Sequence, residues 1–162
     1  MSAAPDAELY AEVADFLYRE AELLDAGKYR EWLSLFHPEG VYWVPASVEQ
    51  ADPHSHVSIF YEDRALLGMR IGRLEHPAAH GVAWPIRTSR VIGNLRLVEA
   101  AGEHLVATSR FHLLEWQNDR QRVFAGSLRH TLARTDTGIT IREKRVDIAG
   151  AEGAFESIQF LF

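Results

Sequence analysis

The feature that most constrains the fold is a series of four long β-prone segments that fills most of the C-terminal half of the chain. The segments span residues 86–99, 103–116, 122–134 and 139–148, and the turn-forming groups between them are Ala101-Gly102, Asn118-Asp119 and Asp136-Thr137-Gly138. Connections this short join neighbouring antiparallel strands. The pattern therefore predicts an antiparallel meander.

The second of these segments alternates in polarity, as a strand covered on one side does. Leu105, Ala107, Phe111 and Leu113 share one face, whereas Thr108, Arg110 and His112 share the other. In the fourth segment, the apolar parity switches between Ile139/Ile141 and Val146/Ile148. This switch predicts a β-bulge or a strong twist.

The N-terminal part is predicted to be helical. Apolar residues recur at helical spacing from Leu9 to Leu24, and the charged residues between them are Glu12, Asp15, Arg19, Glu20 and Glu22. Asp6 is positioned to cap the start of this helix, and Gly27 is positioned to end it. The spacing therefore predicts an amphipathic helix that packs on the sheet.

Shorter elements are expected between this helix and the meander. We predict a second helix over 28–36, a break at 37–40, short strands at 41–44 and 57–61, and a helical segment that begins at 62–64; loops are expected at 46–56 and 76–85. Helices followed by a curved meander define an α+β class, in which the helices cover the concave face of the sheet. We expect a single cone-shaped domain over residues 1–162 with an internal cavity.

The composition excludes several classes of function. The chain has no cysteine, so it cannot hold an iron–sulfur cluster or a thiolate zinc site, nor use a thiol nucleophile. A formal net charge of −6 disfavours nucleic acid as the main partner. No apolar run approaches the roughly 20 residues that span a bilayer, and the N-terminus does not resemble a secretion signal. A cytoplasmic protein that binds neither nucleic acid nor membrane is expected.

Five short motifs occur in an order that resembles one family. They are Phe16-Leu17-Tyr18-Arg19-Glu20-Ala21-Glu22-Leu23-Leu24-Asp25, Trp32-Leu33, Tyr42-Trp43-Val44-Pro45, Tyr61-Glu62-Asp63-Arg64 with Leu67 and Arg70, and Pro85-Ile86-Arg87-Thr88-Ser89-Arg90 with Asn94. Together they resemble the small (β) subunits of aromatic-ring-hydroxylating dioxygenases of the benzoate type. Arg90 stands where many members have His, and a cation that cannot deprotonate changes what this position can pair with.

The resemblance implies a fold and a division of labour. The fold would be the nuclear transport factor 2-like, or cystatin-like, cone. The partner would be a large (α) subunit that holds a Rieske [2Fe-2S] cluster and a mononuclear Fe(II), joined with this chain in an α3β3 hexamer, and the small subunit would also associate as a trimer. This chain would bind no cofactor and no metal, and it would supply no catalytic residue to the dihydroxylation of the aromatic ring.

Several residues are candidates for contact with a partner. They are Glu62, Asp63, Arg64, Trp84, Arg87 and Arg90. Trp84 lies in a loop flanked by Gly and Pro, where core burial is less automatic, and Trp dominates binding hot spots. The predicted strands also carry Arg87, Arg90, Arg96, Arg110, Arg129, Arg142 and Arg145. On an acidic chain these arginines indicate pairing with carboxylates, inside the domain with Glu62 or Asp63 or across a subunit boundary.

Two other classes of function stay open at this point. A cone can house a free-standing, cofactor-independent isomerase or dehydratase, for which Asp25 and His112 are the first candidates and His37 and Asp147 the next; it can also be a small-ligand-binding domain. Metal binding is disfavoured. His76/His80 and His54/His56 have ligand-like spacing, but prolines lie within or beside both pairs and no third ligand is evident. Surface histidines are the preferred interpretation.

Overall fold

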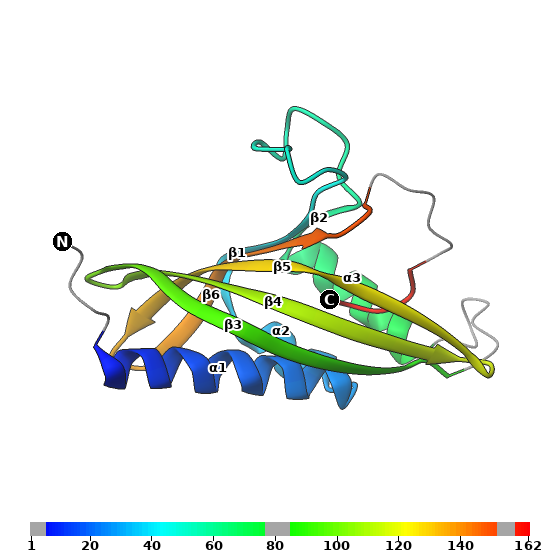
Figure 1. The fold of residues 1–162 in the computed structure, drawn as a ribbon, viewed down its shortest axis with the longest axis horizontal. Helices are drawn as coiled ribbons and strands as arrows, with labels where there is room; N and C mark the ends of the chain where they lie inside the picture. Colours follow the sequence, from blue (N-terminus) through cyan, green and yellow to red (C-terminus); the bar gives the residue numbers. More distant parts are fainter. Residues whose placement is uncertain (1–5, 77–84, 152–157) are drawn as a thin grey trace.

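The strands form one six-stranded sheet in the computed structural model, which describes residues 6–76, 85–151 and 158–162 (Figure 1). The order is β2-β1-β6-β5-β4-β3, with bounds β1 Phe36–Val44, β2 Phe60–Asp63, β3 Arg87–Ala101, β4 His104–Gln117, β5 Arg120–Thr135 and β6 Gly138–Ile148. β1 runs parallel to β6, and the other neighbouring strands are antiparallel. The predicted α+β class is confirmed.

The long strands β3 to β6 form the predicted meander, and β-bulges bend it. Leu132 of β5 pairs with Ile141, whereas the preceding residue pairs with Glu143, so that Arg142 is an extra residue on β6. This bulge explains the parity switch in the sequence. A second bulge, in β3, contains Asn94, whose φ is +52°. Asparagine tolerates this left-handed conformation better than most residues do, which gives the Asn in the family-like motif a structural reason.

Three helices pack against the sheet, and their ends follow the sequence signals. α1 spans Ala7–Asp25, α2 spans Tyr29–Ser34 and α3 spans Arg64–Glu75. Asp6 caps α1, because its Oδ1 accepts a hydrogen bond from the Glu8 N–H at 3.0 Å. Gly27, with φ of +70°, lets the chain leave α1 in a conformation that other residues adopt only at a cost.

Two predicted boundaries are wrong. β1 begins at Phe36, so the strand includes the four residues that the sequence predicts as a break. A register shift after Phe36 accommodates them, and the backbone of Gly40 approaches β6 so closely that a Cβ there would lie 2.6 Å from the Ile141 oxygen. Pairing with β6 therefore overrides the local break signals. β2 starts three residues later than predicted, because it is defined by its pairing with β1.

The core lies between the helices and the inner face of the sheet. α1 runs beneath the sheet along β3, and α2 and α3 continue the helical layer toward β1 and β2 (Figure 1). The buried residues come from both layers and include Val13, Leu17, Leu24, Trp32, Leu105, Phe111, Leu132 and Val146. Phe160, Leu161 and Phe162 are also buried. Within the described ranges, no helix is long and apolar enough to cross a membrane.

Candidate functional site

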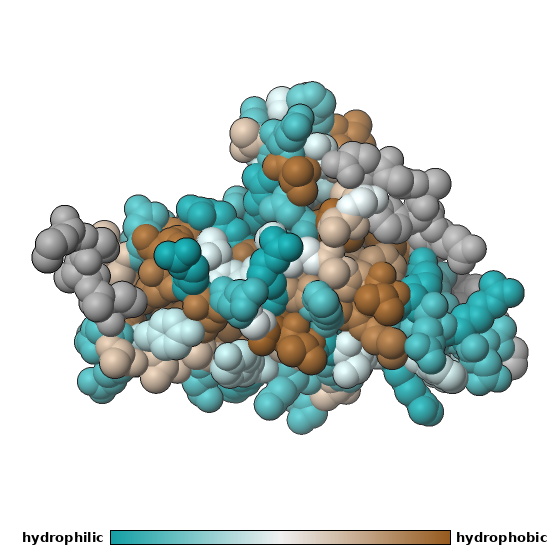
Figure 2. Space-filling model, viewed as in Figure 1, coloured by the Kyte–Doolittle hydropathy of each residue, from teal (hydrophilic) through white to brown (hydrophobic). Residues whose placement is uncertain are grey.

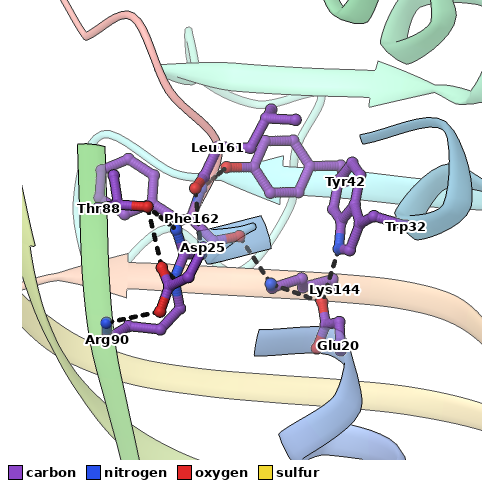
Figure 3. Close-up of polar contacts among 9 residues, drawn as sticks. All are labelled: Glu20, Asp25, Trp32, Tyr42, Thr88, Arg90, Lys144, Leu161 and Phe162. Carbon is purple, nitrogen blue, oxygen red and sulfur yellow. Dashed lines mark hydrogen bonds and ion pairs between the residues drawn. The ribbon is translucent and has the colours of Figure 1, made fainter. Parts of the chain in front are cut away.

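The candidate site is a buried polar cluster on the inner face of the sheet, centred on Glu20 of α1 (Figure 3). Only 2% of Glu20 is exposed. Its Oε1 accepts hydrogen bonds from Trp32 Nε1 at 3.1 Å and from Lys144 Nζ at 2.6 Å. Its Oε2 lies 2.8 Å from Nε2 of His130. One carboxylate therefore ties α1 to α2, β5 and β6.

Lys144 connects this cluster to the last residue of the chain. Its Nζ also donates to the main-chain oxygen of Phe162 at 2.6 Å. The N–H of Phe162 donates to the hydroxyl oxygen of Tyr42 on β1 at 3.0 Å. Both main-chain groups of Phe162 are thus bound by side chains from the sheet (Figure 3). This pairing satisfies polar groups that would be costly to bury alone.

A second group of polar side chains, at the C-terminal end of α1, binds Leu161, the residue before Phe162. Asp25 accepts hydrogen bonds from the Thr88 hydroxyl at 2.9 Å, from the Arg90 main-chain N–H at 2.9 Å and from Arg90 Nε at 2.8 Å. Arg90 NH1 donates to the main-chain oxygen of Leu161 at 3.1 Å. We call the two groups the C-terminal anchor, which consists of Glu20, Asp25, Trp32, Tyr42, Thr88, Arg90, His130 and Lys144.

Burial and charge act in opposite directions on the anchor. Burial alone would raise the pKa of Glu20, but the ammonium of Lys144 and the imidazole of His130 outweigh it and hold that pKa well below its usual range. Burial lowers the pKa of Lys144, and the Glu20 carboxylate partly opposes this shift. Burial raises the pKa of the Tyr42 phenol. Glu20 is therefore a structural anion, and Tyr42 is a neutral hydrogen-bonding group.

The side chains of the tail fill the interior of the cone. The Phe162 ring lies 5.0 Å from the ring of Phe160, 5.5 Å from that of Phe124 and 6.1 Å from that of Phe111, measured between centroids. The cavity that remains beside this cluster has a volume of about 10 Å³, room for roughly one water molecule. The expected internal cavity is therefore occupied, between α1 and the sheet, by the chain's own C-terminal residues.

The structure separates the partner-contact candidates into two groups. Glu62 forms an ion pair with Arg70 of α3, Asp63 caps α3 by accepting from the Leu66 N–H at 3.0 Å, and Arg90 belongs to the anchor with its side chain only 4% exposed. Arg87 is exposed and Arg64 is half-buried at the surface. Trp84 lies outside the described residues.

The candidates for the catalytic alternative do not converge. His112 is exposed on the outer face of β4, whereas Asp25 lies on the inner side and is engaged with Arg90 and Thr88. His37 accepts from the Glu39 N–H at 3.1 Å, and Asp147 pairs with Arg145 at 2.8 Å. The strand parity of His112 is as predicted. No pair of these residues forms an acid–base dyad.

The histidine pairs also lack the geometry of a metal site. His54 and His56 are exposed in the loop that follows β1, and His54 packs against the Tyr61 ring. His76 lies just after α3, and His80 lies outside the described residues. Among the residues that the structure describes, no group of three His, Asp or Glu side chains is placed to hold a metal ion.

The strand arginines have several kinds of partner. Arg90 pairs with Asp25, Arg142 with Glu39 and Arg145 with Asp147. Arg110 donates to the Ser127 hydroxyl at 2.8 Å. The expected pairing with Glu62 or Asp63 is wrong, because α3 uses both residues itself, one in an ion pair and one as its cap.

Sequence reasoning missed most of the anchor. Glu20 counts among the polar residues of an amphipathic helix, yet it lies in register with Val13, Leu17 and Leu24, at spacings of three and four residues that place all four on the buried face. Lys144 likewise shares the strand parity of Val146 and Ile148. The available signal was a charged residue at a core position of each element, Glu20 on α1 and Lys144 on β6. One is an acid and the other a base, so the two can pair.

This architecture defines the class of protein: a cone of two layers in which Phe160, Leu161 and Phe162 pack between α1 and the sheet. Solved structures have the same fold. The beta subunit of the benzoate 1,2-dioxygenase from Burkholderia mallei superposes with a TM-score of 0.78 at 23% identity, covering 98% of this chain and 99% of that chain. An NTF2-like protein with a cystatin-like fold from Novosphingobium aromaticivorans has a TM-score of 0.61 at 18% identity, covering 85% and 80%. The fold is therefore NTF2-like, as predicted.

The sequence comparisons then identify the family. The family model described as "Ring hydroxylating beta subunit" matches residues 19–151. The 2-halobenzoate 1,2-dioxygenase small subunit of Burkholderia cepacia is 32% identical over 142 residues, which cover 85% of this chain and 86% of that protein. The chain belongs to the ring-hydroxylating dioxygenase beta subunit family, and the predicted family is confirmed. The designation of the Burkholderia cepacia relative as a small subunit implies a large-subunit partner for it.

Proposed function

We propose that this chain is a non-catalytic subunit, which holds the large subunits of a dioxygenase in place and contributes no group to the chemistry. The observation that supports this most is the packing of the tail inside the cone. Among the described residues, Phe160 and Phe162 fill the space between α1 and the sheet where an internal cavity is expected, and the anchor binds both main-chain groups of Phe162.

The redox centres would then belong to the large subunit. A Rieske cluster needs two cysteine thiolates and two histidines, and this chain contains no cysteine. The residues of this chain therefore do not fit such a cluster. A large subunit with a Rieske [2Fe-2S] cluster and a mononuclear Fe(II) would supply all of the electron transfer and oxygen chemistry.

The proposed reaction of the assembly is dihydroxylation of an aromatic carboxylate. The aromatic ring, O2, NADH and a proton give a cis-dihydrodiol and NAD⁺, so that the two electrons of NADH and both atoms of O2 are accounted for. The substrate class is suggested by the curated relative, whose name specifies a 2-halobenzoate. We place the assembly in the cytoplasm, where NADH is supplied, and assign it an α3β3 composition with the small subunits also associated as a trimer.

Two residues at the surface are proposed contacts with the large subunit, the half-buried Arg64 and the exposed Arg87. Arg64 at the start of α3 and Arg87 at the start of β3 are accessible for pairing with carboxylates of a partner. Trp84 is retained as a proposed contact. Glu62, Asp63 and Arg90 would act indirectly, because their own bonds fix the start of α3 and of β3.

Co-expression with the large subunit tests this function. We expect the two chains to co-purify as a complex that, given an electron-transfer partner and NADH, converts benzoate to a cis-dihydrodiol. The isolated small subunit should show no turnover. Failure to co-purify, or turnover of a small substrate by this chain alone, would contradict the proposal.

A further inference from the structure

The outer face of the sheet carries three exposed arginines, of which Arg110 bonds to the Ser127 hydroxyl at 2.8 Å. Arg96 of β3 and Arg129 of β5 lie in one row across the sheet, both paired with Thr108 of β4 between them. Arg110 lies in the adjacent row. All three are exposed, and none has a carboxylate partner within the described ranges. With Asp147, which is paired with Arg145, they line a shallow groove of about 470 Å³.

An apolar region continues this basic groove along the same face. Val91 of β3 is 71% exposed and lies opposite the exposed His112 of β4. Val123 of β5 is 69% exposed and lies opposite Leu114, two residues before the partly exposed Trp116. In Figure 2, apolar areas lie over β3 and β4 on the face in view. Apolar residues beside arginines are typical of the core of a protein interface, where aromatic residues and Arg are enriched.

The complementary surface lies on the same chain. Glu8, Asp15 and Glu22 of α1 are exposed at intervals of seven residues, so they form one stripe on the side of the helix that faces away from the sheet. None of the three has an ion-pair partner among the residues described. The lower edge of the view in Figure 2, where α1 lies, is mostly hydrophilic.

The spacings of the two surfaces agree. Two strand separations place Arg96 and Arg129 roughly 10 Å apart. Seven residues of an α-helix also advance by roughly 10 Å, which is the interval between successive carboxylates of the stripe. An α1 helix laid across the strands would therefore set two carboxylates opposite two arginines.

We infer that the basic groove on the outer sheet face binds the acidic stripe of α1 from a second copy of this chain. This inference rests on the proposed function, which includes a trimer of small subunits, and it names the contact that would join them. The two surfaces lie on opposite layers of the molecule, so the contact is heterologous and links copies head to tail; such contacts form rings when the rotation closes, not two-fold dimers. The net charge of −6 makes a second copy an electrostatically suitable occupant of a basic groove.

The test uses two variants that each lose one of the two surfaces. The groove variant is Arg96→Gln/Arg110→Gln/Arg129→Gln, and the stripe variant is Glu8→Gln/Asp15→Asn/Glu22→Gln. Their masses are measured by sedimentation equilibrium at low salt and at about 1 M salt, where the screening length falls to roughly 3 Å. A control variant, Arg73→Gln/Arg120→Gln/Arg142→Gln, removes three exposed arginines elsewhere.

We expect the wild-type chain and the control to form closed oligomers at low salt and monomers at high salt. Each variant alone should be a folded monomer at low salt, whereas an equimolar mixture of the two should form a heterodimer, since one intact contact remains. A monomeric wild type, an oligomeric groove variant or a mixture that stays monomeric would overturn the inference. So would a groove variant that keeps its self-association and loses the large subunit, because the large subunit would then be the occupant. Co-purification of the wild type with the large subunit tests the proposed function separately.

Discussion

The ammonium of Lys144 on β6 lies 2.6 Å from the Glu20 carboxylate on α1, and each side chain is only 3% exposed. The two residues are 124 positions apart in the sequence. Breaking such a buried pair from one side costs about 3–5 kcal/mol; loss of Lys144 leaves Glu20 with His130 and Trp32 alone and leaves the Phe162 oxygen without its ammonium donor. We therefore expect Lys144→Met to reduce the free energy of unfolding by about that amount in urea denaturation.

The double variant Glu20→Leu/Lys144→Met provides the control for this prediction. It removes both charges, so its loss of stability should be smaller than the sum of the two single losses. A Lys144→Met variant within about 0.5 kcal/mol of the wild type, the range of an ordinary surface substitution, would show that the pair does not hold the fold.

The depressed pKa of Glu20 predicts a specific acid response. Because its folded pKa lies below the ordinary value of 4.5, the unfolded state binds a proton first as the pH falls. The stability that Glu20 contributes is therefore fully present above pH 4.5 and is lost as the pH falls toward the folded pKa. The loss approaches about 1.4 kcal/mol per pH unit for this one group.

Denaturant unfolding at several pH values below neutrality measures this response. Glu20→Gln cannot take up that proton, so its stability should fall less steeply below pH 4.5 than that of the wild type. The slopes of unfolding free energy against pH should differ by an amount that corresponds to at most one proton. Parallel stability curves for the two proteins would contradict the assignment of a charged Glu20.

Phe162 gives a test of the closed interior. Replacing Phe162 by Ala keeps its main-chain bonds to Tyr42 and Lys144 but removes the ring that packs on Phe124 and Phe160. The variant should lose about 3–5 kcal/mol of unfolding free energy, and small aromatic molecules should stabilise it because an apolar cavity opens.

Val123→Ala is the matched control, since Val123 is 69% exposed. It should change stability by less than about 0.5 kcal/mol. If aromatic molecules stabilise the wild type as strongly as they stabilise Phe162→Ala, the interior of the native chain is open to ligands, and the proposed structural role is wrong.

Two glycines in the meander differ in their surroundings and should differ in their response to alanine. A Cβ on Gly126 would lie 1.9 Å from the main-chain oxygen of Asp147 on β6, whereas a Cβ on Gly93 would meet nothing within 4 Å. Gly126→Ala should disrupt the β5–β6 pairing and cost more than about 2 kcal/mol. Gly93→Ala should be neutral or stabilising by up to about 1 kcal/mol. Equal melting temperatures would contradict the close approach of the two strands.

The sequence allows prediction of the parts of the fold that local pattern determines. The meander, its bulge near Arg142, both ends of α1 and the outward parity of His112 all follow from periodicity and turn chemistry. The family also follows, because its motifs are spread along the chain in order. Each strand, turn, helix end and motif is defined by residues that are close together in the sequence.

The anchor was not predictable in the same way, because its members are distant in the sequence. Glu20 has the same appearance as the exposed acids of α1 until the registers of Leu17 and Leu24 are compared with its own. Nothing in the local sequence indicates that the Phe162 main chain binds Tyr42 and Lys144. The start of β1 at Phe36 was missed for the same reason, since pairing with Ile141 determines it.

If this chain supplies no group to the reaction, the kcat of the assembled complex does not depend on its polar side chains. His112 is the strongest candidate of the catalytic alternative, and it is exposed on the outer face of β4, whereas Asp25 is bound to Thr88 and Arg90 on the inner side. We predict that a complex containing His112→Ala forms cis-dihydrodiol with the kcat of the wild-type complex. A loss of roughly 100-fold or more, as expected for removal of a general acid or base, in a complex that still assembles would contradict the account.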